Sequence, residues 1–126
     1  MKSRIMKSIF ILLLVPFFLI SCSEDEGIDK IIASIHNNTV VLSNGGKTDL
    51  YYLVIERGTT ALIDWVPSVS DESVALSPGE SVTIPFGDIT GYKAGDRELI
   101  LYYWESVTVN GEKVAGEVQN ELLIIP

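Results

Sequence analysis

Short apolar runs, separated by turn residues, fill most of the chain after residue 30. The runs over 31–35, 39–42 and 49–57 are rich in β-branched and aromatic residues, which predicts three strands. Over 81–86, apolar residues alternate with polar ones, the period of a strand with one buried face. Because Pro85 has no N–H for a central ladder, we expect this strand to lie at a sheet edge or to end there.

The strongest strand signal covers residues 98–109. The dipeptide Asn110-Gly111 follows it and is typical of a type I′ hairpin, so 113–125 should fold back onto this strand. Earlier in the chain, Gly58 leads into another β-like apolar segment, 60–65, and a polar loop follows. No segment shows the periodicity of an amphipathic helix.

About seven short strands in ~100 residues favour an antiparallel β-sandwich of the immunoglobulin-like type over a barrel. The turn sequences at 43–46 and 76–81 resemble recurrent turns in cysteine-less, immunoglobulin-like modules of bacterial surface proteins. This resemblance implies an all-β, immunoglobulin-like domain over 30–126, held together by apolar packing. Residues 45–48 read Gly-Gly-Lys-Thr, but a phosphate-binding loop would need glycine at Val41, so we interpret them as a hairpin turn.

The N-terminus has the layout of a secretory signal, with basic residues ahead of an apolar run over 9–20. The run is shorter than the ~20 residues that a membrane-spanning helix needs. Leu19-Ile20-Ser21-Cys22 resembles the lipobox of bacterial lipoproteins, which implies that 1–21 are removed and that Cys22 is acylated. Each buried CH₂ of the acyl chains contributes about 0.8 kcal/mol, so several chains anchor a protein firmly.

An acidic stretch follows the cysteine directly: Ser23, Glu24, Asp25 and Glu26. It resembles the serine-plus-acidic tag of surface-exposed lipoproteins in Bacteroidetes-type bacteria. The resemblance implies a protein on the outer face of the outer membrane, with 22–29 as lipidated cysteine and linker. The alternative is that the acids are only a solvated spacer.

The charge balance limits the classes of partner. The chain has nine basic and seventeen acidic residues, and three of the basic ones precede Cys22. Seventeen acids thus face six bases in the part that begins at Cys22, which is unsuited to phosphate backbones. We expect no nucleic-acid partner, and a membrane contact only through the lipid anchor.

Few residues suggest a catalytic or metal site, and no cofactor is expected. His36 is the only histidine, too little for a zinc site, and no nucleophile-elbow sequence accompanies it. We expect it on the surface or at a strand end. Asp88, Asp96 and Glu98 flank a glycine-bearing connection over 87–96 and could hold calcium through oxygen ligands, although the EF-hand spacing is missing.

Aromatic residues in adjacent positions are candidate ligand contacts. Neighbouring residues of a strand point to opposite faces, so some of these rings should lie on an outer sheet face, where they would suit a sugar or a protein. The interpretation that we favour makes Trp104 or Trp65 the core aromatic, with the tyrosines covering sheet edges. The candidates are Tyr51, Tyr52, Trp65, Tyr102, Tyr103 and Trp104.

Together these patterns predict a lipid-anchored, surface-exposed binding or structural module that contacts a protein or a glycan and is not an enzyme. Two other classes stay open. One is metal-dependent or carboxylate-based hydrolysis in the loops at 64–72 and 88–98, which hold several acids. The other is a passive envelope spacer without any ligand.

Overall fold

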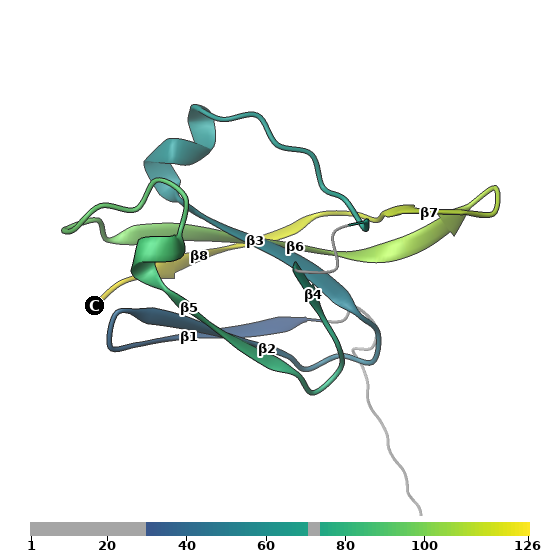
Figure 1. Ribbon diagram of the computed structural model, residues 1–126, viewed down its shortest axis with the longest axis horizontal. Coiled ribbons are helices and arrows are strands. Elements are labelled where there is room, and N and C mark those ends of the chain that lie inside the picture. The colour runs from purple at the N-terminus through teal and green to yellow at the C-terminus, as the bar shows by residue number, and fades with distance from the viewer. Residues whose placement is uncertain (1–29, 71–73) are drawn as a thin grey trace, which may run out of the picture.

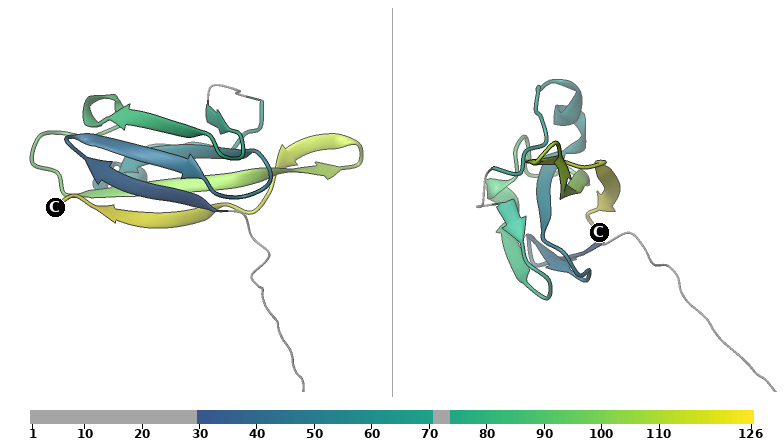
Figure 2. Two further views of the ribbon diagram at one scale, coloured as in Figure 1. Left: turned by 90° about the horizontal axis from the view of Figure 1, so that it is seen from below. Right: turned by 90° about the vertical axis from the view of Figure 1, so that its right-hand side faces the viewer.

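The computed structural model describes residues 30–70 and 74–126. The predicted signal peptide, Cys22 and the acidic tag lie outside these ranges. The described part is a small all-β domain in which two antiparallel sheets face each other, as Figure 1 and Figure 2 show. Its elements are β1 (Ile31–His36), β2 (Thr39–Asn44), β3 (Leu50–Glu56), η3 (Arg57–Ala61), β4 (Ala75–Leu76), β5 (Ser81–Pro85), η5 (Phe86–Asp88), β6 (Glu98–Val109), β7 (Glu112–Ala115) and β8 (Gln119–Ile124).

The smaller sheet has the strand order β1-β2-β5, and the larger one has β4-β3-β6, with β7 and β8 pairing with successive parts of β6. Alternation along each strand sends every second side chain into the space between the sheets. The main core therefore takes Val40 and Leu42 from one sheet and Val54, Leu99 and Leu101 from the other. None of the described helical segments is long and apolar enough to cross a membrane.

Two asparagine-containing turns close hairpins. Asn110 and Gly111 have φ values of 53° and 80°, which confirms the predicted type I′ turn between β6 and β7. Asn37 and Asn38, with φ of 45° and 66°, make an equivalent turn between β1 and β2. Asparagine tolerates this left-handed region better than most residues do. His36 ends β1 and is exposed, as predicted.

The expected hairpin turn at residues 45–48 is wrong, because β2 and β3 belong to different sheets and the segment crosses between them. The crossing is organised by the buried side chain of Asn44. Its Nδ2 donates to the carbonyl oxygens of Leu76 (2.7 Å) and Thr48 (2.8 Å), and its Oδ1 accepts from the Gly46 amide (2.8 Å). A buried amide with all these partners joins the chain segments at this end of the sandwich.

Two predictions about strand limits have opposite outcomes. β5 is an edge strand and ends at Pro85, as the missing N–H of proline requires. The β-like segment 60–65 is not a strand: a 3₁₀ turn, Arg57–Ala61, leads into irregular backbone. The following polar loop contains a two-residue strand, β4, which pairs with the start of β3.

β6 has the predicted limits, but the strand that returns along it is interrupted by a bulge. Glu105 lies opposite Gly116, whose amide donates to the Glu105 carbonyl (2.7 Å), whereas Tyr103 lies opposite Gln119. Two residues, Glu117 and Val118, therefore face the single Trp104, as in a β-bulge. The extra residue reverses the side-chain alternation between β7 and β8. Beyond the bulge, residues 106–115 form a hairpin arm that extends past the sandwich (Figure 2).

Candidate functional site

Four of the six candidate aromatics come together on the outer face of the larger sheet, the face turned away from the smaller sheet. Tyr51 of β3 lies opposite Trp104 of β6, with ring centroids 6.5 Å apart. Trp65 comes from the segment after η3 and packs on both neighbours. Its centroid lies 4.7 Å from that of Tyr102 and 5.8 Å from that of Trp104. The result is an aromatic cluster outside the main core.

The other two candidates, Tyr52 and Tyr103, are cross-strand partners that point the opposite way, into the space between the sheets. Burial raises the pKa of both hydroxyls, and the nearby carboxylates of Glu80 and Glu121 respectively raise the pKa further. The split of adjacent rings between two faces is as predicted. Tyr102 and Tyr103 do not cover a sheet edge, because β6 is an inner strand, whereas β3 has β4 beside it only at Leu50 and Tyr51, so Tyr52 lies next to the open part of that edge.

Residues 57–70, here called the covering segment, pass over this aromatic cluster, as the teal ribbon above β3 and β6 shows (Figure 1). The Glu56 carboxylate caps its first turn: it accepts from the amides of Gly58 and Thr59 (2.9 Å each) and from the Thr59 hydroxyl (2.8 Å). These hydrogen bonds lower the pKa of Glu56, the Gly58 amide contributing most. Gly91, at φ 82°, leaves the space in which the Thr59 side chain lies.

The far end of the covering segment is held by a tryptophan hydrogen bond. Nε1 of Trp104 donates to the carbonyl oxygen of Ser68 (2.9 Å), and only 4% of Trp104 remains exposed. Between the two fixed ends, Leu62 and Val66 point into solvent, with exposed fractions of 81% and 82%. Sequence reasoning did not identify this pair, although apolar residues in a segment bounded by Gly58 and Pro67 were the available signal.

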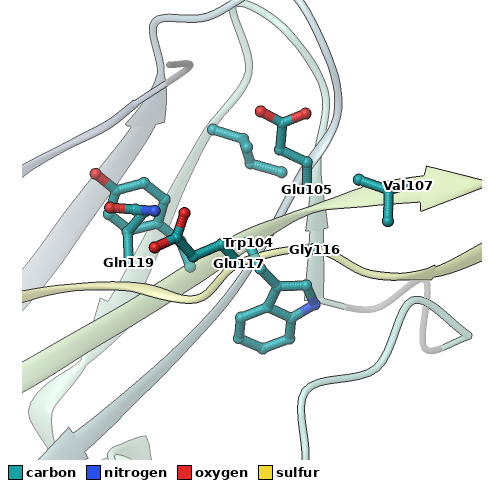
Figure 3. Close-up of a pocket in the computed structure, with 8 residues that line it drawn as sticks. Trp104, Glu105, Val107, Gly116, Glu117 and Gln119 are labelled. Atoms are coloured by element: carbon teal, nitrogen blue, oxygen red, sulfur yellow. The ribbon is translucent and has the colours of Figure 1, made fainter.

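The hollows of the described surface are small or open. One, of about 170 Å³, lies beside Trp65 and Val66. Another, also about 170 Å³, lies at the bulge, where the carboxylates of Glu105 and Glu117 flank it (Figure 3). A groove of about 360 Å³ runs between β1 and β8. The first two are smaller than the ~300–1,000 Å³ of usual pockets for small organic ligands, and the third is an open groove, so these shapes suit contact with a macromolecule better.

Two of the three acids proposed for calcium have other partners. Asp96 accepts from the amide of Lys93 (2.7 Å), and Glu98 forms an ion pair with Arg57 (3.0 Å). Asp88 ends η5. Within residues 30–70 and 74–126, no three or more His, Cys, Asp and Glu side chains form a group that could hold a metal ion.

The candidate contact surface is therefore the covering segment, which packs on the aromatic cluster. No protein-family model matches the chain, and no curated protein or solved structure matches it either.

Proposed function

We propose that the chain is a lipid-anchored, immunoglobulin-like binding module, without catalytic activity, that contacts a protein through the covering segment. The strand order supports the immunoglobulin-like assignment. If β1, β2, β3, β5, β6 and β8 are lettered A, B, C, E, F and G, the sheets read A-B-E and C-F-G, with β4 in the place of a C′ strand beside C.

The observation that carries the proposal is the exposure of Leu62 and Val66 on a segment that is fixed at both ends. A backbone that is already fixed before binding loses little conformational entropy when a partner covers its side chains, and this favours affinity. Trp65 attaches the same segment to the sheet by packing on Tyr102 and Trp104. The aromatic rings pack largely against one another, so the most exposed large side chains of this surface are aliphatic. An aliphatic surface suits a protein partner better than a sugar.

The proposed anchor would orient this surface away from the membrane. Residues 23–29 can span at most about 25 Å when fully extended, so a lipid on Cys22 keeps Lys30 near the bilayer. The Lys30 carbonyl accepts from Gly45, at the end of the sandwich from which the hairpin arm projects. η3 and the C-terminus lie at the other end (Figure 1). Leu62, directly after η3, would then face outward.

The location is tested by two variants. Cys22→Ala should give an uncleaved or mislocalised precursor, since the acyl acceptor is gone. Joint replacement of Glu24, Asp25 and Glu26 by alanine should leave an acylated protein that faces the periplasm. Protease added to intact cells should then digest the wild type and spare the triple variant. Equal digestion of the two would reduce the acidic stretch to a spacer.

The contact surface is tested by site-specific photo-crosslinking in the native cells. A crosslinking residue placed at position 62 or 66 should give the same adduct of defined mass. The same residue at Thr83, exposed on the outer face of the smaller sheet, is the matched control. The adduct at 62 should disappear when Val66 is changed to Asp. Adducts that are equal at all three positions, or absent from 62 and 66, would favour the passive-spacer alternative.

A further inference from the structure

The strand β8 leaves one side of its backbone open. The amide of Ile125 donates to the carbonyl of Arg97 (2.8 Å), which fixes the hydrogen-bonding phase of the β6–β8 ladder. Because bonded and non-bonded pairs alternate, Gln119, Glu121 and Leu123 direct their backbone groups to β6. The backbone groups of Asn120, Leu122 and Ile124 therefore point away from the sheet. Among the described residues, no strand pairs with them.

Three other exposed strands of this domain carry features that discourage pairing, whereas the edge strand β1 lacks them but presents the polar Ser34 and His36 beside Ile32. β4 has two residues, β5 ends in Pro85, and β7 carries Lys113. Short length, proline and lysine are common protections of sheet edges. β8 has none of these over its six residues, and its outer-face side chains Leu122 and Ile124 are 44% and 53% exposed. An edge of this length with exposed apolar side chains is a template for another strand.

A groove beside this edge adds a charge preference. It lies between β1 and β8 and is lined on its apolar side by Ala33, Ile35 and Leu123. Glu121 is the one charged side chain in the lining, and no cation in the described part of the chain forms an ion pair with it. Burial raises the pKa of neighbouring Tyr103, and the Glu121 carboxylate raises it further, which places this carboxylate close to the Tyr103 hydroxyl. A cationic side chain entering the groove would supply the missing partner.

We propose that β8 accepts an extended segment of a partner protein as an additional strand. The segment bonds to the outward backbone groups of Asn120, Leu122 and Ile124. One set of its alternating side chains is apolar and covers Leu122 and Ile124. The other set enters the groove and includes a lysine or arginine that pairs with Glu121.

The acidity of the chain argues against a second copy as this strand. Seventeen acids against nine bases make two copies repel each other. A two-fold pairing centred on residue 121 would also place two carboxylates directly opposite, which is destabilising. This site is separate from the covering segment, since it uses a strand edge and not Leu62 or Val66.

The test selects short random peptides displayed on phage against the purified full-length protein. Selected peptides should alternate apolar residues and carry a lysine or arginine. Their affinities are then measured by calorimetry against Leu122→Pro, Leu122→Ala and Glu121→Gln. Proline removes an outward N–H without breaking a bond to β6, so it should weaken binding at least about tenfold. Alanine keeps the N–H and should cost only a few-fold, and Glu121→Gln should reduce both affinity and salt dependence.

Folding of the variants is checked separately by thermal unfolding. Leu122→Pro should melt near the wild-type temperature, whereas Glu121→Pro, which removes a ladder N–H, should melt lower. Failure to select any peptide, or equal binding to Leu122→Pro and wild type, overturns the proposal. If peptide binding is lost in a Leu62 variant and unchanged in Leu122→Pro, the peptides bind the covering segment, which contradicts the proposal for β8. Dimerisation in analytical ultracentrifugation that Leu122→Pro abolishes would show that the occupant is a second copy, contrary to the proposal.

Discussion

The two faces of the larger sheet are closed in different ways. The inner face packs aliphatic side chains such as Val54 and Leu101 against the smaller sheet. Among the described residues no second sheet packs on the outer face, yet Ile55 and Trp104 on it are as well buried, at 0% and 4% exposure. The cover here is the chain's own segment 57–70, attached through rings and side-chain hydrogen bonds. A sheet face can thus be buried without a second layer, and the segment that buries it is free to carry a binding surface.

The largest effect that separates the faces should come from removing Trp104. Trp104→Ala deletes the ring on which Trp65 packs and the donor to Ser68, so it should cost about 3–5 kcal/mol of unfolding free energy. Leu101→Ala on the inner face is the matched control, with an expected cost of about 2–5 kcal/mol. Both are measured by denaturant unfolding. A cost below about 1 kcal/mol for Trp104→Ala would mean that the outer face is not a second core.

The next largest effect concerns Asn44, whose buried side chain links the two sheets at one end of the sandwich. Asn44→Ala should cost about 2–3 kcal/mol, because it leaves the buried Leu76 carbonyl and the part-buried Thr48 carbonyl without their donor. The cost should appear in global unfolding, since these bonds link segments of both sheets. Ser43→Ala, which removes one exposed hydroxyl contact with Ser81, is the control and should be nearly neutral. An equal cost for both would contradict the role given to Asn44.

The outer face should be the more acid-sensitive one, because a carboxylate caps its cover. The pKa of Glu56 lies below its ordinary value of 4.5, so the carboxylate stabilises the folded form above that pH. This contribution is lost as the pH falls through the lower pKa of the folded state. Limited proteolysis of the covering segment should therefore accelerate on acidification. In Glu56→Gln it should be faster already at neutral pH, whereas Glu112→Gln, exposed on the hairpin arm, should behave like wild type.

The smallest effects on stability are expected at the proposed contact residues. Leu62→Ser and Val66→Ser should change the free energy of unfolding by no more than about 0.5 kcal/mol, since both side chains are in solvent. The same changes should strongly reduce crosslinking to the partner. Thermal unfolding of the two variants supplies the check. A large loss of stability would show that these residues support the fold instead of a contact.

The sequence predicted the long regular strands well and the cover poorly. β6 and its Asn110-Gly111 turn were predictable because a long β-branched and aromatic run meets a dipeptide with one preferred conformation. Segment 60–65 is as apolar as a strand, but the Glu56 cap and the packing of Trp65 hold it in another conformation. Those contacts come from residues distant in sequence, such as Tyr102 and Trp104, and no local pattern reports them.

The bulge and the candidate site show the same limit. The loosely alternating sequence after residue 115 was the only sign that an extra residue interrupts the ladder opposite Trp104. Alternation did predict that adjacent rings would divide between two faces. It could not predict that a distant segment would cover the outer rings, because that depends on where a connection without regular structure is attached.

Residue-level amide and indole hydrogen exchange tests most directly the claim that the outer face is covered over β3 and β6 and open along β8. The indole N–H of Trp104 should exchange slowly because it is bonded to Ser68, and that of Trp65 should exchange faster. Along β8, Gln119, Glu121 and Leu123 should be protected, while Asn120, Leu122 and Ile124 exchange rapidly. Equal rates for the two indoles, or uniform protection along β8, would contradict the account.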